Sequence, residues 1–271
     1  MLPSHLTLHE KLALLNIDAN EHKTIYKSYD VNYLHALGGL LIIDMLLANH
    51  IKWHNKTQIV AEKNNPPTNP LMLLVWELCS TPNKINWFWW GGKRQETAQT
   101  LQDWLKVAVN KTNTLPSQVE KNLLAKQQLQ LKKEHIMGIF PHTYYVLVDT
   151  KDQIAYKNYL KQLVRIGLGT FTPQDYILLK IIKNCKLQDI ITIGEPKKTQ
   201  KQFGDKLEEF TQQAIEHDAI VKFLASLQIE KDLGDIVEAL DSLVDIVDSI
   251  AEATGDVSDS GGDGGGDGGG D

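Results

Sequence analysis

The stretch that decides the fold is Leu6-Thr7-Leu8-His9-Glu10-Lys11-Leu12-Ala13-Leu14-Leu15, together with the apolar run from Val31 to Asn49. Thr7 and Glu10 have the spacing of a capping box, which predicts a helix over 8–17. Asp30 is a favourable N-cap for a second helix over 31–49. Because apolar residues leave this second helix little polar face, we expect it at the centre of the core.

Composition allows a sizeable core, since the chain has 271 residues of which 42% are hydrophobic. The first residues lack the pattern of a signal peptide, and no apolar run approaches the ~20 residues that span a bilayer. These features predict a soluble or peripheral membrane protein. Cys79 and Cys185 lie far apart, which favours buried thiols over a disulfide or a metal site.

Charge is distributed unevenly along the chain. Residues 230–271 hold thirteen acids and one base and so carry −12, whereas residues 1–229 carry +6 within a total of −6. A moderately basic body favours anionic surfaces such as lipid headgroups or nucleic acid. An excess of this size also fits an ordinary solvated surface, so charge alone does not select a partner.

Hydrophobic periodicity and breaker residues predict a single, mostly α-helical globular domain with two β-hairpins. The first hairpin is expected at Ile51 to Ala61, and the second, or an extended loop in its place, within residues 129–149. Further helices are expected over 70–79, 96–109, 116–128, 152–164, 173–184 and 199–227, with Asn69 and Thr172 as N-caps and Gly204 as the weak point of the last one.

The last section of the chain differs in character. Apolar residues recur at helical spacing from Leu233 to Ile250, and acids fill the other face, which predicts an acidic amphipathic helix over 229–254. Residues 255–271 are rich in glycine, aspartate and serine, a composition typical of disordered tails. We therefore expect a helical domain over 1–228, the acidic helix, and a disordered tail.

Few residues point to catalysis. His5 and His9 lie four apart, as do His50 and His54, which is a metal-ligand spacing on a helix. No further ligand accompanies either pair, and the sequence holds no P-loop, nucleophile elbow or dinucleotide-binding glycine motif. We therefore predict no enzymatic activity, no metal and no cofactor.

Two apolar segments are candidates for membrane contact. The aromatic cluster Trp87 to Trp90 precedes a basic turn and would form either an interfacial anchor or part of the core. The second segment is the tip of the expected hairpin, Ile136, Met137, Ile139 and Phe140, beside Lys132 and Lys133. An exposed apolar tip with adjacent cations suits an anionic bilayer, whereas the alternative is packing into the body or across a dimer.

Several stretches occur in an order found in one family. They are "LTLHE", "YLHALGGLLIIDMLLANHI", "PTNPLMLLVWEL", "LQLKKEHIMGIFPHTYYVL" and "TPQDYILLKIIKNCKL". Together they resemble the Golgi phosphoprotein 3 family over residues 6–227, and "IMGIFPHTYY" is most similar to bacterial-type members. The resemblance implies one mostly helical domain with β-hairpins and oligomers formed through the hairpin.

The resemblance also implies a lipid site. Eukaryotic members bind phosphatidylinositol 4-phosphate in a shallow basic pocket, formed by an aromatic residue at the start of the long helix and several arginines or lysines. Tyr29 matches the aromatic position, whereas the arginine of the long helix falls at or near Gly38 and a later basic pair falls near Asn113 and Pro116. The predicted lipid site therefore consists of Tyr29, Lys27, Lys111, Lys121, Lys132 and Lys133. Because a phosphomonoester needs several charge-assisted donors, the missing arginines weaken the case for specific recognition of the 4-phosphate.

We expect a peripheral membrane protein that binds anionic phospholipid headgroups through this site and the hairpin tip. It would act as an adaptor for protein cargo and would not bind nucleic acid. The resemblance implies the cytosolic face of the Golgi for a eukaryotic protein, and the cytoplasm or inner membrane for a bacterial one. One alternative is a soluble interaction module that has lost lipid binding. Another is an enzyme, which only the scattered histidines favour.

The acidic helix adds a separate expectation. Anionic lipid should repel it and the basic body should attract it. It would then either cover the lipid-facing surface and restrain binding, or dock elsewhere on the core or on a second copy.

Overall fold

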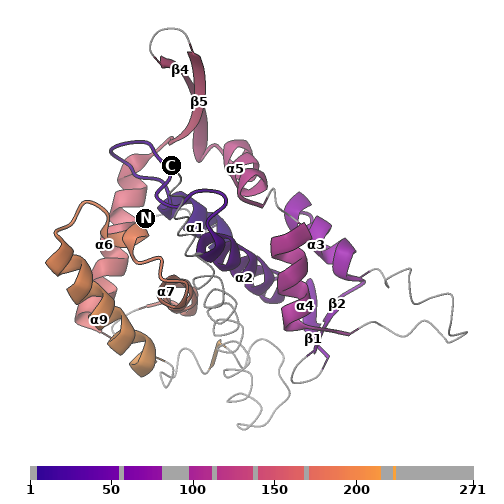
Figure 1. Cartoon of the computed structure of the whole chain (residues 1–271). Helices are drawn as coiled ribbons and strands as arrows, with labels where there is room; N and C mark the ends of the chain where they lie inside the picture. The colour runs from indigo at the N-terminus through magenta and orange to yellow at the C-terminus, as the bar shows by residue number, and fades with distance from the viewer. Residues whose placement is uncertain are drawn as a thin grey trace, which may run out of the picture.

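The computed structural model describes residues 5–54, 58–80, 98–111, 115–136, 140–167, 171–214 and 222–223. Within these ranges the chain is mostly helical with short antiparallel strands (Figure 1), which confirms the predicted fold class. The helices are α1 (Leu8–Leu15), α2 (Val31–Leu47), α3 (Pro70–Ser80), α4 (Leu101–Lys106), the π-helix η1 (Val107–Lys111), α5 (Leu115–Ala125), α6 (Thr150–Ile166), α7 (Pro173–Asn184), α8 (Asp189–Thr192) and α9 (Lys197–Ala214). The strands are β1 (Ile51–Trp53), β2 (Gln58–Ala61), β3 (Gln99–Thr100), β4 (Leu129–Ile136) and β5 (Phe140–Leu147).

Helix α2 forms the centre of the core, as its apolar sequence predicts. Every residue from Ala36 to Leu46 is buried, and α1, α5, α7 and η1 pack around the helix. The predicted N-cap is present, because Asp30 Oδ1 accepts a hydrogen bond from the Tyr33 amide at 3.0 Å. The start of α2 is thereby fixed at the surface while the rest of the helix is enclosed.

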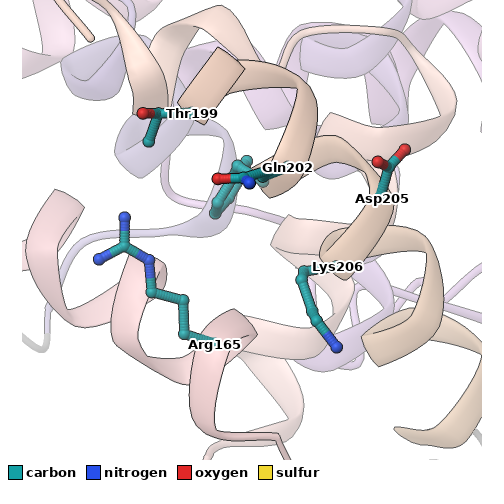
Figure 2. A pocket seen from close by; sticks show the side chains of 6 residues that line it. Arg165, Thr199, Gln202, Asp205 and Lys206 are labelled. Atoms are coloured by element: carbon teal, nitrogen blue, oxygen red, sulfur yellow. The ribbon is translucent and has the colours of Figure 1, made fainter. Parts of the chain in front are cut away.

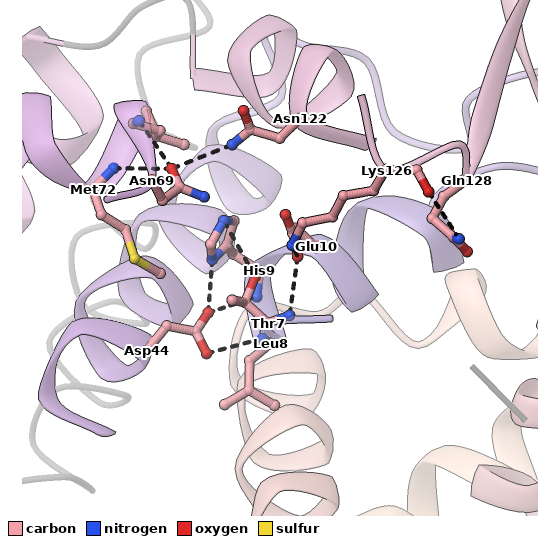
Figure 3. A network of polar contacts seen from close by, with 11 residues as sticks. Thr7, Leu8, His9, Glu10, Asp44, Asn69, Met72, Asn122, Lys126 and Gln128 are labelled. Atoms are coloured by element: carbon pink, nitrogen blue, oxygen red, sulfur yellow. Dashed lines mark hydrogen bonds and ion pairs between the residues drawn. The ribbon is translucent and has the colours of Figure 1, made fainter. Parts of the chain in front are cut away.

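A buried carboxylate of α2 holds the first turn of α1 (Figure 3). Asp44 Oδ1 accepts a hydrogen bond from the Leu8 amide at 2.9 Å. Asp44 Oδ2 accepts one from the His9 amide at 3.0 Å and lies 2.6 Å from His9 Nδ1. The amides of a helix's first turn have no hydrogen-bond acceptor within the helix, so Asp44 supplies acceptors for two amides of α1.

The same motif also ties α1 to the region after α5. The Thr7 amide donates to Glu10 Oε2 at 3.0 Å, which is the contact expected of the predicted capping box. Lys126 Nζ binds the same Glu10 oxygen at 2.7 Å (Figure 3). The stretch "LTLHE" therefore joins α1, α2 and the segment that leads into β4.

The first hairpin is confirmed, but the helix expected over 96–109 is partly wrong. Strands β1 and β2 pair from Ile51 with Ala61 to Trp53 with Ile59, and β3 adds a third strand beside β2. The helix begins only at Leu101, because Thr100 acts as its N-cap and accepts from the Asp103 amide at 3.2 Å. From Val107 the helix continues as η1, whose wider turn packs against α2.

The second hairpin is also confirmed. Strands β4 and β5 pair from Leu129 with Leu147 out to Ile136 with Phe140, after a turn in which Gln127 has a left-handed φ of 58° and ends α5 earlier than predicted. At the base, Leu129, Val146 and Leu147 are buried. Figure 1 shows the hairpin standing away from the helical body, with α5 beside its base. The two strands thus extend away from the helical body.

The remaining helices form a second layer. Thr172 caps α7 and accepts from the Asp175 amide at 3.2 Å, as its position before Pro173 predicts. Helix α9 packs against α6, α7 and α8 and continues through Gly204 without a break. The helix expected over 199–227 is therefore confirmed as far as Ala214.

Both cysteines are buried free thiols, as predicted. Within the described residues no helix is both long and apolar enough to cross a bilayer. The predictions for Trp87 to Trp90, for Met137 and Ile139, and for residues 229–271 lie outside the described residues.

Candidate lipid-binding site

Tyr29 is presented at the surface by the turn that leads into α2. Its side chain is 78% exposed, and the neighbouring Val31 is 38% exposed. Lys27, two residues before it, is also exposed. Because Asp30 holds the first turn of α2, the aromatic ring projects from a fixed helix end.

The predicted cations are available to a ligand where the structure describes their side chains. Lys27, Lys121, Lys132 and Lys133 are all exposed, and no described residue forms a hydrogen bond or ion pair with their amines. By contrast, Lys126 binds Glu10 at 2.7 Å and Lys52 binds Glu62 at 2.7 Å. Lys111 ends η1, and its side chain lies outside the described residues.

The start of α2, helix α5 and the hairpin base meet around Glu120, which the sequence analysis missed. The Glu120 carboxylate is close enough to both Tyr33 in the first turn of α2 and Tyr145 on β5 to act on them electrostatically. Burial is the main cause of the raised pKa of both tyrosines, and the carboxylate adds to it. Lys121 follows Glu120 on α5, and Lys132 pairs with Tyr144, the neighbour of Tyr145, across the hairpin.

Glu120 gives this junction an acidic character that the predicted basic pocket does not have. Burial raises the pKa of its carboxyl to about 7. The sequence held a signal for its position, since Leu115, Val119 and Leu123 form the buried stripe of α5 and Glu120 flanks it. A carboxyl that is partly protonated near neutral pH can either donate a hydrogen bond to a phosphate or repel it.

Packing fills the space around Gly38, at or near which the resemblance places an arginine of the family. Gly38 is buried in α2, and a Cβ atom built on it would lie 2.8 Å from Val109 Cγ2 of η1. Pro116, near which one of the later basic positions falls, is buried as well. Neither position presents a side chain that could contact a headgroup.

The histidine pairs do not converge on a metal site. His9 is fully buried against Asp44, and His50 Nδ1 lies 2.9 Å from the Asn65 carbonyl oxygen, whereas His5 and His54 are exposed. Among the described residues, no group of three histidine, cysteine or acidic side chains is placed to hold a metal ion.

Comparison of the sequence with models of known protein families gives a match over most of the chain. The model of the Golgi phosphoprotein 3 family matches residues 8–227, which is the whole described body from α1 to Phe223. The chain belongs to this family. None of the curated proteins with which it was compared matches it.

Proposed function

We propose that this Golgi phosphoprotein 3 family member is a peripheral membrane protein that binds anionic phospholipid and acts as an adaptor without catalysing a reaction. The observation that supports it best is the β4–β5 hairpin, which leaves the body with Lys132 and Lys133 exposed and without a described partner. Successive residues of a strand point to opposite faces, so each face of the hairpin carries one cation. The family's ability to bind phosphatidylinositol 4-phosphate supports the same assignment.

Membrane attachment by this hairpin would be reversible. Each lysine near an anionic surface contributes about 1 kcal/mol. Each large apolar side chain of the tip sequence that enters the bilayer adds on the order of 1.5–3 kcal/mol. Tyr29 and Lys27 at the start of α2, with Lys121 on α5, would add contacts to the headgroups. The location would be the cytosolic face of the Golgi in a eukaryotic cell, or the cytoplasm and inner membrane in a bacterium.

Vesicle flotation tests the proposal. Full-length protein should float with vesicles that contain phosphatidylglycerol or phosphatidylinositol 4-phosphate at low salt, and not with neutral vesicles. The double variant Lys132→Glu, Lys133→Glu should lose at least about tenfold in affinity, because each lost lysine removes about 1 kcal/mol. The matched control is Lys197→Glu, Lys198→Glu, an exposed pair on α9, far from the hairpin in Figure 1.

Two results would reject the proposal. One is failure of the wild-type protein to bind any anionic vesicle at low salt. The other is an equal loss for both double variants, which would mean that only net charge matters. Rejection would favour a soluble interaction module of the same fold, the function that buried Gly38 and the acid Glu120 support.

A further inference from the structure

A groove separates the C-terminal end of α6 from the first half of α9 (Figure 2). Its volume is about 350 Å³. In Figure 2 Arg165 lies on one side of the groove and Lys206 on the other, with Gln202 between them. The lining residues are Arg165, Thr199, Gln202, Phe203, Asp205 and Lys206. None of these belongs to the predicted lipid site.

The groove combines cations with apolar surface. No described residue forms an ion pair with Arg165, and Lys206 binds Glu209 in a pair whose side chains are 55% and 51% exposed. Such a surface pair is worth about 1 kcal/mol or less, so a ligand can replace it. Phe203 in the lining is buried, and Ile166, next to Arg165, is 79% exposed.

The charges favour an acidic ligand in spite of Asp205 in the lining. Lys201 on α9 is exposed and adds a further cation near the groove. Thr199 lies in the first turn of α9, where the helix dipole is positive. A peptide that carries both acidic and apolar side chains would therefore complement both the cations and the apolar surface of the groove.

We propose that the acidic segment 230–252 of the same chain binds in this groove. The segment carries eight acids and a single lysine, and its apolar residues recur at helical spacing. It thus has both the negative charge and the apolar side chains that complement the cations and the apolar surface of the groove. This inference does not depend on lipid binding.

The length of the intervening chain allows this contact. At 1.5 Å per residue, Thr199 to Lys206 lie roughly 12–22 Å back along α9 from Ala214, and 15 residues separate Ala214 from Glu230. Phe223 packs against the core, so the segment starts from the surface of the domain. A short tether gives an effective concentration in the mM range, which fills a site that would be weak between separate molecules.

The groove lies away from the predicted lipid-binding lysines of the hairpin. Arg165 lies 15 residues along α6 from Thr150, or roughly 22 Å from the base of the hairpin. A segment bound here would leave Lys132 and Lys133 accessible. Binding in the groove would therefore cover apolar surface without restraining attachment to a membrane.

Disulfide trapping in the full-length chain tests the contact. Gln202→Cys and Ser242→Cys place one thiol in the groove and one in the segment, while Cys79 and Cys185 are 1% and 0% exposed and do not compete. We expect a disulfide within one molecule, formed at least about tenfold faster than with Gln212→Cys, an exposed residue on another face of α9. Equal rates for the two positions, or disulfides only between molecules, would overturn the proposal.

A charge reversal tests the electrostatic part. Arg165→Glu should slow trapping about tenfold, whereas Lys151→Glu, the same charge change at the other end of α6, should leave the rate unchanged. Should a cysteine variant fail to fold, carbodiimide coupling of the wild-type chain replaces trapping. Carboxylates of 230–252 should then couple to Lys201 and Lys206, and predominant coupling to Lys132 and Lys133 would refute the groove.

Discussion

The replacement of Asp44 by asparagine tests how the fold is held together. The carboxylate accepts from the Leu8 amide at 2.9 Å and from the His9 amide at 3.0 Å, and lies 2.6 Å from His9 Nδ1. Asparagine has almost the same shape but a single acceptor oxygen, so its NH₂ group must face at least one of these amides. A buried donor left unpaired costs about 1–3 kcal/mol, and loss of the charge weakens the remaining bond.

We therefore expect Asp44→Asn to lower the free energy of unfolding by about 2–4 kcal/mol. For a chain of this size this corresponds to a fall in Tm of roughly 5–15 °C. Urea unfolding at pH 7 followed by circular dichroism, with a thermal scan, measures both quantities. The matched control is Asp103→Asn, whose carboxylate also accepts a hydrogen bond from an amide at the start of a helix, that of Thr100, but is exposed, and which should cost less than about 1 kcal/mol.

The reasoning would be refuted if the two variants had the same stability within about 0.5 kcal/mol, the usual range of neutral surface changes. That result would mean that water or a shifted backbone satisfies the amides of α1 as well as Asp44 does. A large loss confined to Asp44→Asn would instead show that α1 is stable only while it is docked on α2.

Three further predictions follow from burial and packing. Burial raises the pKa of Glu120 to about 7, so the folded state binds a proton more tightly than the unfolded state does. The free energy of unfolding should therefore fall as pH rises from about 4.5 to 7. Glu120→Gln should remove this pH dependence and, after allowance for partial exposure, add about 1 kcal/mol to the free energy of unfolding at pH 8, as measured by urea unfolding. Burial raises the pKa of the Cys79 and Cys185 thiols to about 12, so a thiol reagent at pH 8 should react with neither in the native protein and with both in denaturant. Gly38→Ala should destabilise by about 1 kcal/mol in spite of alanine's helix preference, and Val109→Ala should recover most of that loss in the double variant, because the added Cβ meets Val109 Cγ2.

The elements that sequence predicted well are those whose signals are local. Thr7 with Glu10, Asp30, Asn69 and Thr172 each act within three residues of a helix start, and each marks a helix that the structure contains. The two hairpins were predictable for the same reason, since alternation and turn residues lie within each segment.

The features that sequence missed depend on partners far along the chain. Gln99 and Thr100 form a strand only because Gln58 and Ile59, about forty residues earlier, offer a free edge. Asp44 reads as one polar interruption of an apolar helix, and only the tertiary structure shows it capping α1. No local pattern encodes either contact.

The candidate site likewise combines features that the sequence predicts with features that only the fold reveals. Exposure of Tyr29, Lys132 and Lys133 was predictable, because a turn and a solvent-facing strand place them outside the core. The electrostatic effect of Glu120 on both Tyr33 and Tyr145 was not predictable, because it requires α5 to meet two elements at once. The position of Glu120 is therefore a property of the fold rather than of any one motif.

Gly38 leaves no room for a longer side chain in this packing. An arginine at this position would need space that Val109 occupies, so η1 and a headgroup-binding arginine exclude each other in this packing. Recognition of a lipid by this chain would then rest on the exposed cations Lys27, Lys121, Lys132 and Lys133 rather than on a pocket built for one phosphate. A lysine ammonium is a point charge on a flexible side chain. It responds to the charge density of a lipid surface more than to the position of a phosphate on a headgroup ring. Under the proposed function, selectivity among anionic lipids of equal charge should therefore be weak.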